Sequence, residues 1–494
     1  MTTPIVGAED SRAALLSSDA FWWLFCLLIL ALTLLLVAFD PLPKVFLGDS
    51  GSYLWTALSG WIPPDRSFLY GYIIRWSSLR TESLTSLLIF QALLGAITAI
   101  LVALVCRRIF GLTAVLSYFF GFLCLLDPLQ LVWQRYVMTE TISLFFYVLV
   151  LLFSFLYLKQ RHLWQLAILQ VLCVLVISLR MSYLLVVQVS AFVLPLIAFL
   201  PELRAAFRKH SSTLSRTSVA RSVGLHLAVS VLLMFVLQQG YQQLNGRLAG
   251  REPAYLHAAG LTILATWAPA LRPTDSPDPR LSDLIAKGSQ FQLNDVQERN
   301  AQLYVHGRLV DRWRQIEPNA AIQNQVAKQT ALHALLHRPI SVAMLGAKTF
   351  LGYWDFSQFR RTAKNDFNSA FKWDVSMTDD AAHFNFPPPS RREGMKAYTL
   401  LQRYQLRALP YYYVVLLSPF VCGVLIFFVS EGYVLLLFIH SWILLASISF
   451  LSMVPNARYL QPMSLLTILI FAVLLKGLID RRRRSKIPPR MQFR

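Results

Sequence analysis

Residues 21–39 read FWWLFCLLILALTLLLVAF, a run without a single charged residue. A helix of roughly 20 apolar residues crosses about 30 Å of hydrocarbon, so this run is long enough to span a membrane. Arg12 is the only basic residue before it, and no small-residue cleavage site follows before Pro41 and Pro43. We therefore expect the segment to remain as a membrane helix and not to be removed as a signal peptide.

The composition of the whole chain agrees with this first run. Of 494 residues, 56% are hydrophobic and 15% are charged, whereas soluble domains have about 45–50% apolar and about 25% charged residues. Apolar runs of spanning length lie near 21–39, 86–106, 110–127, 142–158, 163–179, 182–200, 225–240, 411–429, 433–452 and 462–478. The sequence predicts an α-helical polytopic membrane protein with about ten spans, or twelve if the apolar stretches 254–271 and 339–353 also cross. Those two stretches could instead lie in the interface or re-enter the membrane.

The positive charge of the chain has a definite location. Lys and Arg number 46 against 26 Asp and Glu, a formal charge of +20, which in a soluble protein would suggest a nucleic-acid partner. Here the basic residues fall in alternate connections, notably 107–108, 159–162, 201–224 and the tetra-arginine tail from 481. Because Lys and Arg are retained in cytoplasmic loops, we predict that both termini are cytoplasmic and that no nucleic acid is bound.

This topology divides the chain into four parts. Residues 1–240 form an N-terminal transmembrane module with a first outward loop at 40–85, and residues 241–410 form a mainly helical outer domain. Residues 411–480 form the last membrane helices, and residues 481–494 a basic cytoplasmic tail. All five cysteines lie in or at the ends of predicted spans, so no disulfide is expected in the outer domain. The chain has no P-loop and no dinucleotide fingerprint, which argues against an ATP-driven pump or a redox enzyme.

The first outward loop carries the leading catalytic candidate. It contains GDSGSY at 48–53, with Asp49, Ser52 and Tyr53, and DRSFLYG at 65–71, with Arg66 and Tyr70. A carboxylate just beyond a membrane helix, among small residues that admit a substrate, suits a general base that takes a proton from a hydroxyl. The alternative is that Asp49 and the serine after it only cap an interfacial helix.

The second outward loop leads from Arg135 to Glu140, at the start of an apolar helix. An unpaired charge at the membrane boundary is costly, so Glu140 is expected to have a partner or a function. Arg135 could pair with Glu140 or hold a phosphate. The alternative for Glu140 is a first-turn acid favoured by the helix dipole, with Thr139 as the cap.

Two further arginines lie in short outward loops. Arg180 is an isolated charge in a long apolar stretch, and Arg458 precedes Tyr459 in PNARYLQP at 455–462. An arginine at this depth could bind a lipid phosphate through paired hydrogen bonds, or Arg180 could simply extend to the headgroups. The topology brings all these loops to one face of the membrane, where helices meet headgroups, as a site for an anionic lipid substrate requires.

This pattern resembles the GT-C superfamily of membrane glycosyltransferases, which includes protein O-mannosyltransferases, lipid A aminoarabinose transferases and arabinofuranosyltransferases. The similar features are the acid after span one, the acid in the second outward loop, the large late outer domain and the Arg-Tyr-x-x-Pro sequence at 458–462. The resemblance covers mainly residues 21–200 and 410–480. Many relatives have two adjacent acids in the first loop, whereas here Asp49 is followed by Ser50, which leaves the base and any metal site open.

The resemblance implies a fold, an activity and residue roles. It implies a GT-C-like bundle in a bacterial inner membrane, with a periplasmic active site that transfers a sugar from a polyprenyl-phosphate donor to a lipid, glycan or protein acceptor. Asp49 and Glu140 match the catalytic acids. Arg180, Arg458 and Tyr459 would bind the donor phosphate, while Ser52, Tyr53, Arg66, Tyr70 and Arg135 would position substrates. No cofactor is required, although a divalent metal is compatible with this chemistry.

Two other functions stay open. A polysaccharide polymerase or ligase would also use polyprenyl-linked sugars, with arginines in the outer loops but no need for an acid after span one. A flippase or transporter of lipid-linked sugars would need polar residues in mid-span, where few occur. His333 and His337 have a spacing that can bind zinc, but no third ligand is evident, so we predict that they are an ordinary surface pair and not metal ligands.

Overall fold

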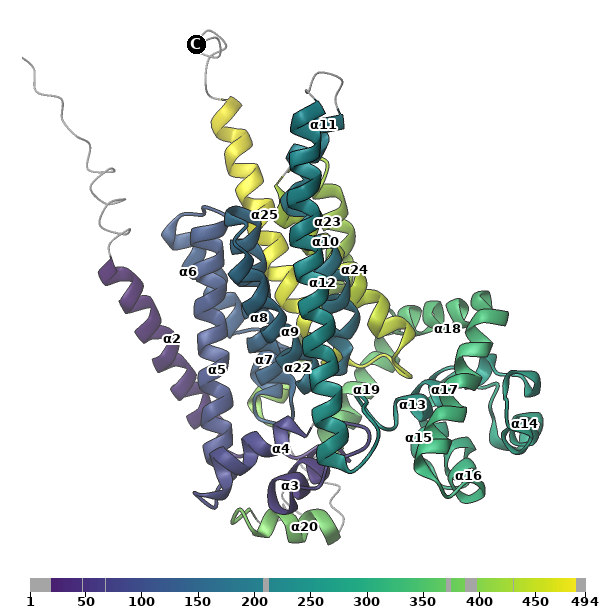
Figure 1. The fold of residues 1–494 in the computed structure, drawn as a ribbon. Coiled ribbons are helices and arrows are strands. Elements are labelled where there is room, and N and C mark those ends of the chain that lie inside the picture. The colour runs from purple at the N-terminus through teal and green to yellow at the C-terminus, as the bar shows by residue number, and fades with distance from the viewer. Residues whose placement is uncertain are drawn as a thin grey trace, which may run out of the picture.

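The structure is a computed structural model that describes residues 19–46, 48–66, 68–207, 213–369, 375–386, 398–429 and 431–485. The centre of the predicted basic loop 201–224 and the tail beyond residue 485 lie outside the described residues. Within the described part the chain is helical and forms no strand, with one isolated bridge between Lys44 and Tyr136 (Figure 1).

Among the described residues, seven helices are long and apolar enough to cross a membrane, or eight if one bent pair counts as a single span. The seven are built on α2 (Asp19–Phe39), α5 (Leu84–Leu104), α8 (Glu140–Gln160), α10 (Leu184–Ala198), α12 (Thr213–Ala249), α24 (Gly432–Phe450) and α25 (Gln461–Ser485). The bent pair is α22 (Leu400–Arg407) with α23 (Tyr411–Leu425), which meet at 53°. This is the architecture of an α-helical membrane protein.

The ten predicted spans all fall on apolar helices, but not all of these have full length. α6 (Ala114–Leu125) has 12 residues and α9 (Leu163–Leu179) has 17. Both are shorter than the 18 residues of Met181–Ala198, in which a 3-10 turn precedes α10, so the number of crossings stays a prediction. The stretch 254–271 forms only α13 (Ala259–Thr266) and a 3-10 turn, too short to cross a bilayer. The stretch 339–353 forms α18 (Pro339–Gly352), another short apolar helix.

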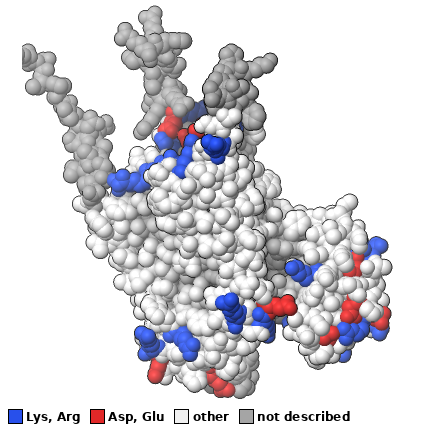
Figure 2. Space-filling view, in the orientation of Figure 1, with Lys and Arg blue, Asp and Glu red and all other residues white. Residues whose placement is uncertain are grey.

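The helices pack closely where their side chains are small. Gly121 of α6 faces α5: a Cβ atom there would lie 3.1 Å from the carbonyl oxygen of Ala99. The outer surface of the bundle also carries apolar side chains. On α2, for example, Trp23 is 66% exposed and Leu27 is 62% exposed. On the face in Figure 2 the middle of the bundle is free of charge, and Lys and Arg gather toward its two ends. An apolar belt between charged rims is what a hydrocarbon environment requires.

The predicted outer domain is only partly a separate body. α13, α14 (Pro279–Ala286), α15 (Arg299–Tyr304), α16 (Leu309–Ile316) and α17 (Ala320–His337) form a small helical unit beside the bundle (Figure 1). Its own core includes Leu264, Leu281 and Trp313. The predicted boundary between the N-terminal module and the outer domain, at residue 241, falls inside α12. This helix continues to Ala249, because the polar residues after the apolar run 225–240 are also helical.

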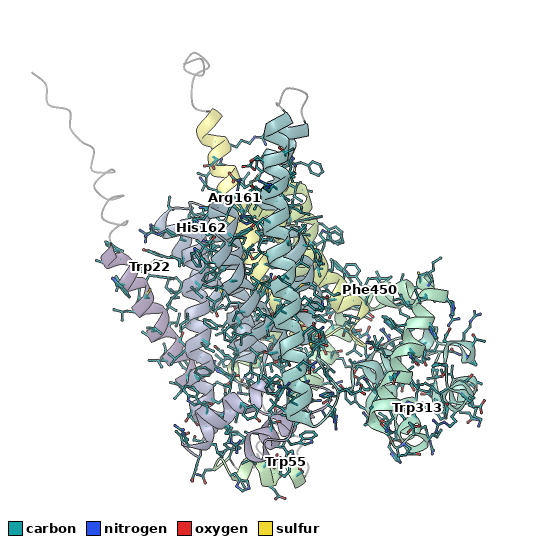
Figure 3. All side chains as sticks on the ribbon, viewed as in Figure 1. Trp22, Trp55, Arg161, His162, Trp313 and Phe450 are labelled. Carbon is teal, nitrogen blue, oxygen red and sulfur yellow. The ribbon has the colours of Figure 1, made fainter. Side chains whose placement is uncertain are left out.

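After this unit the chain returns to the bundle. α19 (Phe356–Ser369) leads to α20 (Val375–Ala382), which packs on α3 (Asp49–Ser59) through Met377. α22 contacts α7 (Pro128–Trp133), and Gln402 donates a 3.1 Å hydrogen bond to the Tyr136 hydroxyl nearby. Figure 1 places α3, α4 (Leu69–Ile74) and α20 at the lower end of the bundle, and α11 (Leu200–Phe207) and the end of α25 at the upper end. In Figure 3, Trp55 marks the lower end, and Arg161 lies toward the upper end.

Candidate functional site

The first loop turns into α3 immediately before Asp49. Gly48 has a φ of 81° and precedes the helix without a side-chain cap, a backbone angle that favours glycine. The Ser50 hydroxyl accepts a hydrogen bond from the Phe46 amide at 2.7 Å and donates to the Val137 carbonyl at 2.8 Å. Ser50 thus joins the loop before α3 to the loop before α8, and the carboxylate of Asp49 does not cap the helix.

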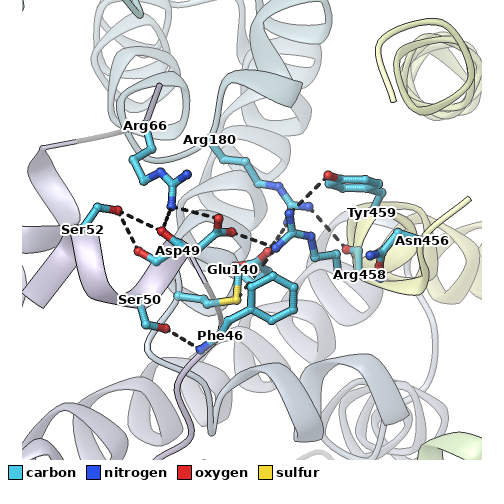
Figure 4. Close-up of polar contacts among 12 residues, drawn as sticks. Phe46, Asp49, Ser50, Ser52, Arg66, Glu140, Arg180, Asn456, Arg458 and Tyr459 are labelled. Carbon is cyan, nitrogen blue, oxygen red and sulfur yellow. Dashed lines mark hydrogen bonds and ion pairs between the residues drawn. The ribbon is translucent and has the colours of Figure 1, made fainter. Parts of the chain in front are cut away.

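The Asp49 carboxylate lies between two arginines that are distant in sequence (Figure 4). Its Oδ1 is 2.9 Å from Arg66 Nη1, and its Oδ2 is 2.9 Å from Arg458 Nη1. Burial would raise the pKa of Asp49, but the charges of Arg66 and Arg458 outweigh this, so the pKa is lowered from its ordinary value. Asp49 is therefore ionised at neutral pH, and it is a weak base while both arginines hold it.

Aromatic rings fix the position of Arg458. Its guanidinium carbon is 4.7 Å from the Phe46 ring centroid and 5.0 Å from that of Tyr459, distances at which a cation and a ring attract. Its Nη2 donates to the Tyr459 hydroxyl at 3.2 Å. Asn456 accepts a 2.9 Å hydrogen bond from the Arg458 amide and so caps the short helix at Ala457–Leu460.

Glu140 and Arg180 form the second half of the cluster. Arg180 Nη1 is 3.7 Å from Glu140 Oε1, and Arg180 Nη2 donates to the Arg458 carbonyl at 3.4 Å. Glu140 does begin α8, but Thr139 makes no side-chain cap hydrogen bond. Only 9% of the Arg180 side chain is exposed, so it does not extend to the surface but lies inside the cluster. In the described part of the chain, Glu140 Oε2, Arg180 Nη1 and Arg458 Nε are buried without a hydrogen-bond partner.

These side chains surround a cavity of about 230 Å³. The predicted site residues that line it are Asp49, Tyr53, Arg66, Glu140, Arg180, Arg458 and Tyr459. Three arginines face three acids, because Asp65 also lines the cavity and pairs with Arg66 at 2.7 Å. Sites that enclose a whole small molecule measure about 300–1,000 Å³, so this cavity suits the reacting part of a larger substrate.

Three predicted positioning residues lie outside the cavity. The Ser52 hydroxyl donates to the Asp49 carbonyl at 2.9 Å within α3. Tyr70 is fully buried, donates to Gln91 Oε1 at 2.8 Å and supports Tyr53, since the two ring centroids are 4.8 Å apart. These two residues act on the site only through other residues.

Arg135 is the third of these residues. It is 1% exposed, and its guanidinium has no hydrogen-bond partner among the described residues. Burial lowers its pKa to about 10. Of the two roles open to Arg135, the pairing with Glu140 is not formed, because Arg180 takes that place.

Sequence reasoning missed some residues at the site. Tyr241 of α12 and Leu256 line the cavity, and Asp366 of α19 lies near enough that its pKa responds to Arg458. Burial raises the pKa of Asp366 to about 7, against the opposing effect of Arg458. No local pattern marks these residues, whereas Asp65 stands in the same loop as Asp49 and could have been included.

The described residues hold no group of three or more His, Cys, Asp or Glu placed to bind a metal ion. His333 Nδ1 is 2.9 Å from the Asp275 carbonyl, and His337 Nδ1 is 3.6 Å from the carboxylate of the same residue. Asp49 and Asp65, the acids of the first loop, both pair with Arg66.

Comparisons of the chain with protein-family models, with curated proteins and with solved structures give no match.

Proposed function

We propose that this protein is an integral-membrane glycosyltransferase of the GT-C type, which transfers a sugar from a polyprenyl-phosphate donor to an acceptor at the outer face. One observation carries the proposal. Asp49, Arg180 and Arg458, from three distant segments, meet at one small cavity beside the ends of apolar helices. Displacement of a sugar from a phosphate needs both a base for the acceptor and cations for the leaving group.

The arginines are suited to the phosphate of the donor. Arg180 Nη1 and Arg458 Nε are buried donors without hydrogen-bond partners in the described part of the chain, and leaving such groups unsatisfied is costly. A phosphate offers several acceptor oxygens and fits the guanidinium geometry. The prenyl chain would lie in the hydrocarbon beside the bundle, so only the phosphate and the sugar need to enter the cavity.

Binding of the phosphate would also activate Asp49. A phosphate that engages Arg458 competes with the carboxylate for this cation, and the pKa of Asp49 then rises from its lowered value. Asp49 accepts the proton of the acceptor hydroxyl while the acceptor oxygen bonds to the anomeric carbon. The bond from that carbon to the phosphate oxygen breaks, and its electron pair leaves with the phosphate. Glu140 holds Arg180 for this step.

We also propose the topology of the chain. The ten helices that carry the predicted spans cross the membrane, the end with α3 and the unit of α13–α17 face the periplasm of a bacterial inner membrane, and both termini are cytoplasmic. The five native cysteines are buried, so single introduced cysteines can be labelled with little background. A membrane-impermeant maleimide should label Trp61→Cys in intact spheroplasts and Arg481→Cys only after lysis. The opposite pattern would reverse the orientation.

The activity itself is tested by deletion and complementation. Mass spectrometry of envelope lipids, glycans and proteins should reveal one pentose or hexose missing from one acceptor class in a deletion strain. The wild-type chain should restore this sugar, and Asp49→Asn should not. Glu82→Gln is the matched control, because Glu82 is an acid of the same end that does not line the cavity.

The outcomes separate the competing functions. Restoration by a correctly inserted Asp49→Asn protein would overturn the assignment of the base and favour a polymerase or ligase. Movement of a lipid-linked sugar across purified liposomes without any covalent product would favour a flippase. Loss of a repeating polymer in place of a single sugar would also contradict the proposal.

A further inference from the structure

A second, larger cavity lies at the opposite end of the bundle. Its volume is about 1170 Å³, against about 230 Å³ at the candidate site. It opens among the ends of α8, α10 and α23, the start of α24 and the last turns of α25, near Arg161 in Figure 3. Nothing in the proposed transfer reaction uses this space.

The walls of this cavity are hydrocarbon. They come from both halves of the chain and include Phe155, Leu158, Ile197, Val424, Leu425, Val473 and Leu474. On one side the cavity continues to the outer apolar surface, since Val424 is 57% exposed and Phe428 is 73% exposed. A hydrocarbon chain could enter this space directly from the bilayer.

The rim of the cavity is cationic. Its charged residues are Arg108, Lys159, Arg161, Lys476, Arg481, Glu431 and Asp480. Lys476 pairs with Asp480 at 2.7 Å, and Arg161 pairs with Glu202 at 2.6 Å. Within the described residues no ion pair is formed by the remaining cations, Arg108, Lys159 and Arg481.

We propose that this cavity binds one anionic phospholipid of the adjacent leaflet. The acyl chains would lie along the apolar walls, and the headgroup phosphate would meet Arg108, Lys159 and Arg481. A free phosphate would leave the apolar volume empty, and a neutral lipid would leave the excess of positive charge unbalanced. Basic pockets between membrane helices on the cytoplasmic side bind anionic headgroups in this way. The lipid would bridge α8 and α10 of the N-terminal module to the C-terminal helices.

Native mass spectrometry of the full-length protein in detergent tests this inference. Phosphatidylglycerol and phosphatidylcholine with identical acyl chains are added separately, and the retained lipid is counted. We expect one phosphatidylglycerol to be retained at least tenfold more than phosphatidylcholine. The triple variant Arg108→Ala, Lys159→Ala, Arg481→Ala should abolish this preference, whereas Arg107→Ala, a neighbouring cation outside the cavity lining, should keep it.

A second variant tests the volume and not the charge. Val424→Trp fills the cavity from an exposed position, and Leu417→Trp is its control, because Leu417 is 47% exposed on the same helix and does not line the cavity. Only Val424→Trp should lose the lipid. Equal retention of both lipids, or retention of phosphatidylglycerol by the triple variant, would overturn the proposal. Preferential retention of added polyprenyl phosphate over phosphatidylglycerol would show that the occupant is not a phospholipid. These readouts need no transfer activity, so they do not depend on the proposed function.

Discussion

The two ends of the bundle use charge differently. At the end with α3, three arginines and three acids line a small cavity, and Asp49 is held between two of the arginines. At the end with the last turn of α25, five cations and two acids line a much larger cavity. The first arrangement is internally compensated, and the second has an excess of positive charge that no described residue of the rim balances.

This difference indicates two kinds of anion recognition. An anion that binds to a compensated cluster competes with the carboxylates of the cluster for their arginines, so its binding changes the pKa of those carboxylates. An uncompensated rim attracts an anion without such exchange, and partial exposure weakens each contact. Changes at the first end should therefore alter reactivity, whereas changes at the second end should alter lipid affinity or stability and leave reactivity unchanged.

The largest expected effect is at Arg458. Arg458→Ala removes one cation from Asp49 and one from the donor phosphate, so we expect the transfer rate to fall about 10³-fold. Initial rates on labelled donor measure this, with Arg80→Ala as the control at an exposed position of the same end. A rate within threefold of wild type, in a protein that elutes and melts normally, would remove Arg458 from the mechanism.

Arg66→Ala should change the pH dependence of transfer. Arg66 helps to keep the pKa of Asp49 below its ordinary value, so its removal moves the acid limb of the rate profile to higher pH. The lowered pKa also makes folding stability depend on pH. The ion pairs of Asp49 stabilise the folded state fully above about pH 3.9, the pKa of an aspartate in the unfolded chain. This stabilisation is lost as the pH falls through the lower pKa that Asp49 has in the folded state. An unmoved acid limb in Arg66→Ala would contradict the assignment of Asp49 as the base.

A smaller effect, on the melting temperature, is expected at Asp366. Burial raises its pKa to about 7, so the folded state loses stability as pH rises from about 3.9 to about 7. Asp366→Asn removes this cost and should melt a few degrees higher than wild type at pH 8, with little difference at pH 4. Asp379→Asn, at an exposed position, should show no such dependence. A lower melting temperature for Asp366→Asn at pH 8 would mean that the ionised form is the stabilising one.

The smallest effect is expected at the rim of the large cavity. Lys476 pairs with Asp480 at 2.7 Å in one turn of α25, and these side chains are 26% and 40% exposed. Such pairs contribute about 0.3–0.5 kcal/mol, so Lys476→Ala should shift the melting temperature by no more than about 2 °C and leave transfer unchanged. A loss of activity would show that the two ends are coupled.

Local patterns in the sequence predicted the helical membrane fold and part of the candidate site. The first predicted span and the spans after it are long apolar runs, as expected of membrane helices or buried core helices. Each of these runs lies on a helix. Asp49, Glu140, Arg180 and Arg458 stand out because each is a charge beside an apolar run. Topology alone placed their loops on one side, and the structure brings their side chains to one cavity.

Other features depended on contacts between distant segments. Arg135 and Tyr70 come from the same loops as the cavity residues, yet their side chains are buried away from the cavity. The packing of the helices decides the direction of a side chain, and its position in a loop does not. Asp366 comes from α19, in the segment that returns to the bundle after the helical unit of α13–α17, and no spacing in the chain relates it to Arg458.

The amino-acid sequence thus determined by itself where the helices are and that they belong in a membrane, because the transfer of apolar side chains from water depends on local composition. Only the tertiary structure decided which carboxylate meets which arginine. The pairing of Asp49 with Arg458 joins residues 409 positions apart, and its strength depends on a distance and a degree of burial that exist only after the helices have packed.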